Sequence, residues 1–287
     1  MVNMTGKSVL SIRQVGFGVA MIWGVFGAMF FAAYLPVMID LVRAWNGSDD
    51  YSHGFLIVPI ALYIVWHKRG LLAGTQIAGS WVGLPVAIIS LLMYLFARVG
   101  EILTLASLSM IGVIAGSVLF LFGFGVLRVL LFPLLLLLFM IPVPAQIYAT
   151  LTIPLQLLVT KSTASMASSV GIPLYCEGNV IHHSQGTLEV VQACSGLRSI
   201  MALLTIGAVF GYFSLRSNVL RLILFISAIP VAVAVNILRV FAMLVAIQFL
   251  GIDISKGTPH TILGIALFGV AVAIFVLIRK GLSFWER

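Results

Sequence analysis

Charged residues are scarce in this chain. Only 8% of its 287 residues are Asp, Glu, Lys or Arg, whereas 62% are hydrophobic. Soluble domains carry about 25% charged residues. No polar segment long enough to form an ordinary soluble domain separates the apolar runs. The sequence therefore predicts an all-α polytopic membrane protein that forms a single integral membrane domain over residues 1–287.

Cysteine is also scarce, and several catalytic motifs are missing. The two cysteines, Cys176 and Cys194, are too few for a disulfide scaffold or a cysteine zinc site. The absence of an HExxH motif argues against an intramembrane zinc protease. The chain also has no Walker A motif, so nothing in the sequence indicates nucleotide binding. The adjacent His182 and His183 would point to opposite faces of a strand, so they are unsuited as co-ligands. No metal and no cofactor is predicted.

The net charge of +8 does not indicate a nucleic-acid partner. The cations cluster at the ends of apolar runs, which is the pattern of loops that remain on the cytoplasmic side of a membrane. The first apolar run lacks a convincing cleavage site, so we expect it to be a retained span and not a signal peptide. We expect no additional soluble domain at the C-terminal end.

Eight apolar runs are candidates for transmembrane helices, each of which needs about 20 residues. They cover residues 15–37, 53–66, 81–97, 102–122, 129–141, 197–213, 219–250 and 261–278. The seventh run is too long for one straight crossing. We expect Pro230 to kink it, and Asn236 and Arg239 to mark where it leaves the hydrocarbon. A polar segment is expected from Asp40 to Ser52, and a turn at 123–128 that holds Arg128.

Two segments between the fifth and sixth runs do not have the composition of transmembrane spans. Residues 146–172 mix apolar residues with Thr, Ser and Lys161, and Pro154 interrupts them. This pattern favours an interfacial or re-entrant helix on the outer face. The polar stretch 173–192 then contains two short runs, 179–183 and 187–192, around Ser184-Gln-Gly186. These runs predict a small β-hairpin, so that 143–193 forms an outer-face segment ahead of catalytic spans at 194–278.

The distribution of charge predicts the topology. If the N-terminus is cytoplasmic and 146–172 does not cross, ten of the 16 basic residues lie inside and seven of the eight acids lie outside. That bias follows the positive-inside rule. Both termini are then cytoplasmic, and Cys194, Arg239 and His260 lie at the outer face.

Three polar residues fall at one depth in this topology. Cys194 precedes the basic residue Arg216 by 22 positions, Arg239 follows Arg221 by 18, and His260 precedes Arg279 by 19. Each interval is about one bilayer thickness at roughly 1.5 Å per helical residue. Because the three lie on consecutive spans, they are expected to be neighbours.

A thiol, a guanidinium and an imidazole at one depth suggest covalent catalysis. Cys194 would be the nucleophile, activated by a nearby cation and by the N-terminus of the following helix. His260 would act as acid and base, and Arg239 would stabilise an oxyanion or hold a carboxylate. Simpler interpretations stay open. Cys194 could be a packing residue or pair with Cys176, Arg239 could snorkel to the interface, and His260 could cap its helix.

Five further residues are candidates for substrate binding or for support of the site. Tyr51 and His53 lie in an outer Tyr-Ser-His-Gly sequence, for which an interface anchor is the favoured interpretation. Arg198 lies near Cys194 and could shape the pocket, and Asn236 lies near Arg239. Ser195 stands beside Cys194 and could itself be a nucleophile, but no second motif supports a serine enzyme.

Four short motifs together resemble those of the exosortases, a family of bacterial inner-membrane enzymes. They are Tyr51-Ser-His-Gly-Phe-Leu with Pro59, Ala193-Cys-Ser-Gly-Leu-Arg198, Asn236-Ile-Leu-Arg239 and Thr258-Pro-His-Thr-Ile-Leu-Gly264. They occur in the family's order over about residues 50–265. The resemblance implies a Cys-Arg-His catalytic set similar to that of sortases, on an unrelated membrane fold.

The resemblance also implies a substrate and a location. The substrate would be a secreted protein with a PEP-CTERM tail, made of a Pro-Glu-Pro-like motif, a transmembrane helix and a basic end. Cleavage through a thioacyl-enzyme at the periplasmic face would be followed by hydrolysis or by transfer to an unknown envelope acceptor. The alternative is a transporter, or a membrane component of exopolysaccharide export, without catalysis.

Overall fold

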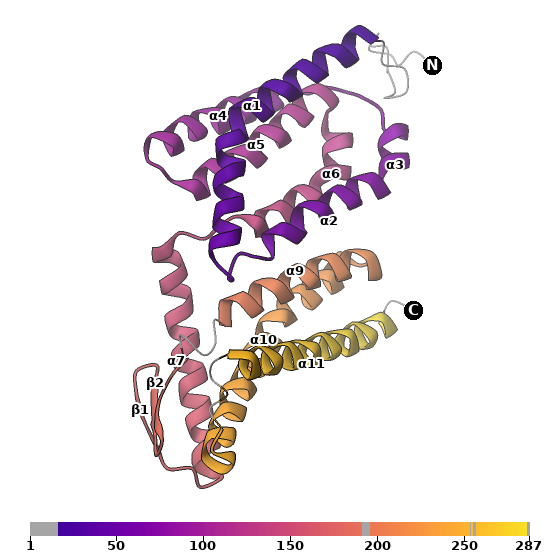
Figure 1. Cartoon of the computed structure of the whole chain (residues 1–287). Helices are drawn as coiled ribbons and strands as arrows, with labels where there is room; N and C mark the ends of the chain where they lie inside the picture. The colour runs from indigo at the N-terminus through magenta and orange to yellow at the C-terminus, as the bar shows by residue number, and fades with distance from the viewer. Residues whose placement is uncertain (1–16, 191–195, 253, 255–256, 286–287) are drawn as a thin grey trace. The chain divides into compact units, whose positions relative to one another are not determined.

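The computed structural model describes residues 17–190, 196–252, 254 and 257–285. Its contacts divide the chain into two compact units, Met1–Val143 and Pro144–Arg287, and each is described here by itself (Figure 1). Both are built mainly of helices, and the second unit also contains a small antiparallel sheet. The predicted all-α polytopic membrane class is confirmed.

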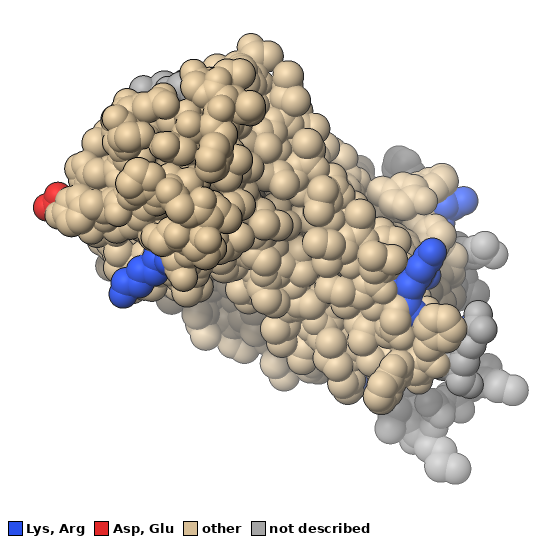
Figure 2. All heavy atoms as spheres, turned by 90° about the horizontal axis from the view of Figure 1, so that it is seen from below, with Lys and Arg blue, Asp and Glu red and all other residues tan. Residues whose placement is uncertain are grey.

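Four helical segments in the described residues are long and apolar enough to cross a membrane. They are Gly24–Gly47, Leu103–Phe122, Asn218–Leu250 and Gly257–Phe284. Counting the successive helical segments Phe124–Met140 and Ala145–Ser169 as one broken span makes five. Gly54–His67, Gly83–Val99 and Arg198–Ser214 are apolar but shorter, so the predicted number of eight spans stays a prediction. The face seen in Figure 2 carries very few charged side chains.

The first unit is a set of helices joined by short turns. Its elements are α1 (Phe17–Gly47), α2 (Gly54–His67), α3 (Arg69–Gly74), α4 (Gly83–Val99), α5 (Leu103–Phe122), α6 (Phe124–Leu136) and the 3₁₀ helix η2 (Leu137–Met140). The short helix α3 falls in a stretch for which no element was predicted.

Two boundaries of the first unit correct the sequence-based prediction. Helix α1 continues through Asp40, where a polar segment was expected to begin. The Asp40 carboxylate lies 3.2 Å from the Arg43 guanidinium and 3.7 Å from that of Arg98, so the acid is paired within the fold. The turn expected at 123–128 also shrinks to Gly123, whose φ of +86° reverses the chain. Arg128 therefore lies inside α6 and not in a turn.

Glycines allow α4 and α5 to pack closely. A β-carbon on Gly83 would collide with the backbone nitrogen of Phe120, and one on Gly116 would lie 2.6 Å from that of Ala87. Gly112 and Gly116 are spaced as in the small-xxx-small pattern, which lets helix backbones approach each other in membranes. The packing of α4 against α5 thus depends on residues without side chains.

The second unit begins with a long helix and a sheet. Helix α7 (Ala145–Ser169) runs without a break through Pro154. Strands β1 (Leu174–Glu177), β2 (Val180–His183) and β3 (Gly186–Glu189) follow and form an antiparallel sheet in that order. The predicted hairpin is therefore present as β2 and β3, and β1 adds a third strand that the sequence did not indicate. Placement of α7 in the membrane interface stays a prediction.

In the part of the chain that the structure describes, three further helices complete the second unit, and α10 is the central one. They are α9 (Gly196–Ser214), α10 (Asn218–Val245) with its π-helical continuation η3 (Ala246–Leu250), and α11 (Gly257–Phe284). Helix α10 packs against α7, α9 and α11. Helix α10 runs on to Val245, so Arg239 lies within the helix. The expected exit from the hydrocarbon at Asn236 and Arg239 stays a prediction.

Two apolar clusters hold the helices and the sheet of the second unit together. One joins α9, α10 and α11 and includes the buried residues Leu203, Leu224 and Phe275. The other packs Ile181 and Leu188 of the sheet against α7 and α10. One face of the sheet is thereby fixed to the helices, while its other face carries exposed or half-buried side chains.

Candidate functional site

Arg239 and His260 are in direct contact. Arg239 lies on α10 and His260 in the first turn of α11, and the Arg239 Nη2 is 2.8 Å from the His260 Nε2. The two residues are 21 positions apart in sequence, so the packing of α10 against α11 brings them together. The structure thus joins two of the three residues that the sequence analysis placed at one depth.

The contact determines the state of the imidazole. A guanidinium has only donors, so Nε2 of His260 accepts this hydrogen bond. The ring is therefore neutral here, and its proton lies on Nδ1. The Ile254 backbone bonds the His260 ring as well, whereas the buried Nε of Arg239 has no hydrogen-bond partner among the described residues. Arg239 therefore keeps one buried donor with unused hydrogen-bonding capacity.

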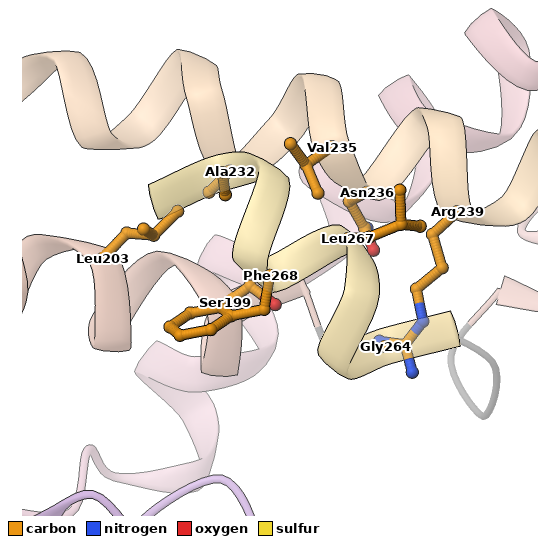
Figure 3. Close-up of a pocket in the computed structure, with 10 residues that line it drawn as sticks. Ser199, Leu203, Ala232, Val235, Asn236, Arg239, Gly264, Leu267 and Phe268 are labelled. Carbon is orange, nitrogen blue, oxygen red and sulfur yellow. The ribbon is translucent and has the colours of Figure 1, made fainter. Parts of the chain in front are cut away.

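Gly264 makes room for the guanidinium. It lies one helical turn after His260 on α11, and a β-carbon there would be 2.8 Å from Nη2 of Arg239 and 3.3 Å from its Cζ. Figure 3 shows the guanidinium of Arg239 beside the backbone of α11 at Gly264. Any larger residue at this position would have to displace the group that bonds His260. The sequence analysis did not single out this role, although Gly264 closes the motif that contains His260.

A narrow cavity of about 20 Å³ lies beside Arg239 and has room for about one water molecule. Its lining comes from α9, α10 and α11 (Figure 3). Asn236 is buried one turn before Arg239 and contributes to the lining, as does Ser199 of α9. Ser199 was missed by the sequence analysis, in which only its neighbours Ser195 and Arg198 were considered. The site is thus polar at Asn236, Arg239 and Ser199, and apolar elsewhere.

Helix α9 begins next to the predicted nucleophile. Cys194 and Ser195 themselves lie outside the described residues, so their predicted roles stay predictions. The helix starts at Gly196, and Arg198 is exposed in its first turn. Arg198 also lies within electrostatic range of His260. A thiol that precedes a helix N-terminus lies where the helix dipole favours a thiolate.

The second cysteine differs from the predicted nucleophile. Cys176 is a free thiol in β1. Because Cys194 lies outside the described residues, the alternative in which the two cysteines form a disulfide stays a prediction. Burial raises the pKa of the Cys176 thiol above its usual value. Because the thiolate is the reactive form, this thiol is a weak nucleophile at neutral pH.

Tyr51 and His53 belong to the first unit and bond the main chain there. The Tyr51 hydroxyl donates to the Val143 carbonyl at 3.2 Å. His53 Nε2 lies 3.0 Å from the Phe139 carbonyl, and since a carbonyl only accepts, Nε2 carries the proton. Both residues thus hold the segment 139–143, which leads out of the first unit.

Two residues that the sequence analysis did not single out bond the same segment. The Trp45 indole donates to the Met140 carbonyl at 2.8 Å, and the Thr104 hydroxyl donates to the Pro142 carbonyl at 2.7 Å. Gly54 makes the Trp45 contact possible, because a β-carbon there would collide with the indole nitrogen. The Tyr-Ser-His-Gly motif therefore helps to hold residues 139–143, the last segment of the first unit, in place.

In the described part of the chain, no group of three His, Cys, Asp or Glu side chains could hold a metal ion. The arrangement at Arg239 and His260 instead offers acid–base chemistry and anion stabilisation. A neutral imidazole can accept a proton at its unprotonated nitrogen. A buried guanidinium can stabilise negative charge on an oxygen.

Comparison with known proteins identifies a family. The model of the transmembrane exosortase family matches residues 45–277, which is most of the chain and includes Tyr51, Cys194, Arg239 and His260. Searches of curated proteins and of solved structures gave no match.

Proposed function

Because this chain belongs to the transmembrane exosortase family, and so is a membrane transpeptidase or protease of the exosortase type, we propose that it acts through Cys194. The single observation that carries this proposal is the 2.8 Å contact between Arg239 and His260. It supplies a cationic donor on α10 and a base on α11, the two helices after α9. A thiol, a base and an anion-stabilising group form the minimum set for cysteine acyl transfer.

The proposed reaction has two acyl transfers. The Cys194 thiol loses its proton to His260, and the sulfur attacks the carbonyl carbon of the scissile bond. As the carbon–nitrogen bond breaks, His260 gives its proton to the leaving amine. A thioester then joins Cys194 to the substrate. Water or an acceptor amine attacks this thioester with His260 as base, which releases an acid or a new amide and restores the thiol.

Arg239 would change partners during the first step. In the structure its Nη2 occupies the Nε2 lone pair of His260, which is the lone pair that must receive the thiol proton. We infer that the substrate carbonyl draws the guanidinium away as negative charge develops on its oxygen. The same movement would free Nε2 to accept the proton. Arg239 thus serves as oxyanion donor and His260 as acid and base.

The substrate is proposed to be the PEP-CTERM-like tail of a secreted protein. Its transmembrane helix would enter from the lipid bilayer, and its cleavage motif would emerge at the outer face of the bacterial inner membrane. The charge distribution supports a periplasmic site and cytoplasmic termini. The acceptor that competes with water is an unknown component of the envelope.

A processing assay tests this function. A secreted reporter that ends in a Pro-Glu-Pro-like motif, an apolar helix and a basic end is expressed with the protein, and its cleavage is followed by gel mobility. The wild type is expected to shorten the reporter, and Cys194→Ala and His260→Ala are expected to leave it intact. Cys176→Ala is the matched thiol control and should retain cleavage. Cleavage that persists in Cys194→Ala would refute the proposed nucleophile.

A further inference from the structure

Among the residues that the structure describes, strand β3 is paired along one edge only. The sheet order β1-β2-β3 places β3 at an edge, with β2 as its neighbour. In their register, Ile181 is opposite Leu188 and Val180 is opposite Glu189. No described residue forms a main-chain hydrogen bond with β3 on its other side.

The register shows which groups of β3 face outward. The Val190 N–H donates to the Asn179 carbonyl at 3.0 Å, just beyond the last pair of the ladder. Hydrogen-bonded pairs alternate with non-hydrogen-bonded pairs in an antiparallel ladder. Leu188 is two positions from Val190, so it also bonds β2. The N–H and C=O groups of Thr187 and Glu189 therefore point away from β2.

This edge is held in place by the core. Leu188 and Val190 are buried in the cluster that joins the sheet to α7 and α10, whereas Thr187 and Glu189 are exposed. The hairpin turn is fixed as well, because the Ser184 hydroxyl donates to the Gln248 side chain at 2.8 Å. The free groups of Thr187 and Glu189 thus belong to an ordered strand and form a preset template.

The edge lies close to the predicted nucleophile along the chain. Cys194 follows Glu189 by five residues, a chain length of at most about 18 Å. A peptide that is paired with β3 for a few residues can therefore continue over a similar distance to reach the thiol. This proximity along the chain is what links a free sheet edge to the chemistry of the site.

We propose that the free edge of β3 binds the extended segment of the substrate by adding it to the sheet as a fourth strand. The occupant is a polypeptide in β conformation, held by main-chain hydrogen bonds to Thr187 and Glu189. Strand addition of this kind gives affinity through the backbone, while side chains that alternate between the two faces give specificity. The inference rests on the proposed function and adds a residue-level binding mode to it.

The outer face of the sheet supplies side-chain contacts for such a strand. Tyr175, His182 and Thr187 are aligned across the three strands by the register. The His182 ring stacks on Tyr175 with ring centroids 5.2 Å apart. A peptide side chain next to Thr187 would extend this row. The mode also suits a segment with proline at alternate positions, because the residue between two prolines can present both its N–H and its C=O to the edge.

Proline substitution at the edge tests the proposal. Glu189→Pro removes one outward N–H and leaves the bonds to β2 in place, and proline is tolerated at a free sheet edge. Glu189→Ala is the matched control, because it also loses the carboxylate. Both changes are made in the Cys194→Ala background, and the intact reporter tail that copurifies with each protein is quantified. Glu189→Pro is expected to reduce recovery about fivefold relative to Glu189→Ala, the effect of one lost hydrogen bond.

Further variants separate the possible outcomes. Thr187→Pro against Thr187→Ala repeats the test at the second outward position, and equal thermal unfolding temperatures within each pair show that the fold is kept. Equal recovery within both pairs would overturn the proposal. So would a change in oligomeric state on Glu189→Pro with recovery unchanged, because the edge would then join two copies of the chain. Failure of the proposed function shows separately, as reporter cleavage that persists in Cys194→Ala.

Discussion

The guanidinium of Arg239 lies beside Gly264, where the β-carbon of any other residue would lie 2.8 Å from Nη2. The same Nη2 bonds His260, which lies one turn earlier on the helix of Gly264. The absence of a side chain at position 264 therefore leaves the space from which the guanidinium bonds His260.

Gly264→Ala is expected to lower the rate of tail cleavage by up to about a hundredfold, because a displaced guanidinium no longer meets both His260 and the substrate. The control is Gly269→Ala on the same helix, where a β-carbon meets nothing within 4 Å. Since alanine favours helix formation over glycine at both positions, a loss confined to position 264 cannot come from helix stability. Cleavage rates in isolated membranes provide the measurement, and equal rates for the two variants would contradict this positioning role.

Replacement of Arg239 by lysine separates charge from geometry. Arg239→Lys keeps the positive charge but loses the planar set of donors that can bond His260 and an oxyanion from one group. We expect kcat for tail cleavage to fall by at least about a hundredfold, with a smaller change in KM. The lysine variant should be nearly as inactive as Arg239→Gln. Near wild-type kcat in Arg239→Lys would mean that a positive charge alone is sufficient.

The four side chains that bond residues 139–143 should affect stability more than chemistry. Trp45→Phe removes an indole N–H from a buried bond to the Met140 carbonyl and should lower the free energy of unfolding by about 1–3 kcal/mol. Tyr51→Phe removes a longer bond in a half-buried position and should cost less. Thermal unfolding in detergent measures both changes. Cleavage by the protein that remains folded should be unchanged, and a selective loss of kcat would instead assign Tyr51 to the chemistry.

The two cysteines should respond differently to pH. Burial raises the pKa of Cys176, so its thiolate is scarce at neutral pH and its fraction grows as pH rises toward that pKa. In Cys194→Ala, labelling of Cys176 by iodoacetamide should therefore be slow at pH 7 and increase about tenfold per pH unit below the pKa. In Cys176→Ala, labelling of Cys194 should already be fast at pH 7. Similar slow labelling of both thiols would argue against an activated Cys194.

The sequence predicted much of the helical framework because long apolar runs have few alternatives in a membrane. The prediction of element boundaries was wrong where a residue or strand is stabilised by a partner that the local sequence does not reveal. Asp40 marked the end of a helix in the sequence, yet its pairing with Arg43 and Arg98 lets α1 continue. Strand β1 was missed because Leu174-Tyr-Cys-Glu177 is short and is defined mainly by its pairing with β2.

In the candidate site too, some features could be predicted from the sequence and others depend on how the helices pack. The intervals from basic anchors placed Arg239 and His260 at one depth, and the structure has them in hydrogen-bond contact. The roles of Gly264 and Ser199 depend on which helix faces pack together, which no single run of sequence records. Tyr51 and His53 were noted as candidates from their motif, but the carbonyls that they bond lie more than 80 positions away in the sequence.

The most direct test of the central claim is to locate the acyl group on the enzyme. Membranes that contain the wild type and the reporter tail are quenched in acid during turnover, digested and analysed by mass spectrometry. The account predicts a fragment of the substrate joined to the peptide that contains Cys194, and its release by neutral hydroxylamine as expected for a thioester. An adduct on Ser195 or Cys176 that survives in Cys194→Ala would contradict it, as would turnover with no adduct on Cys194.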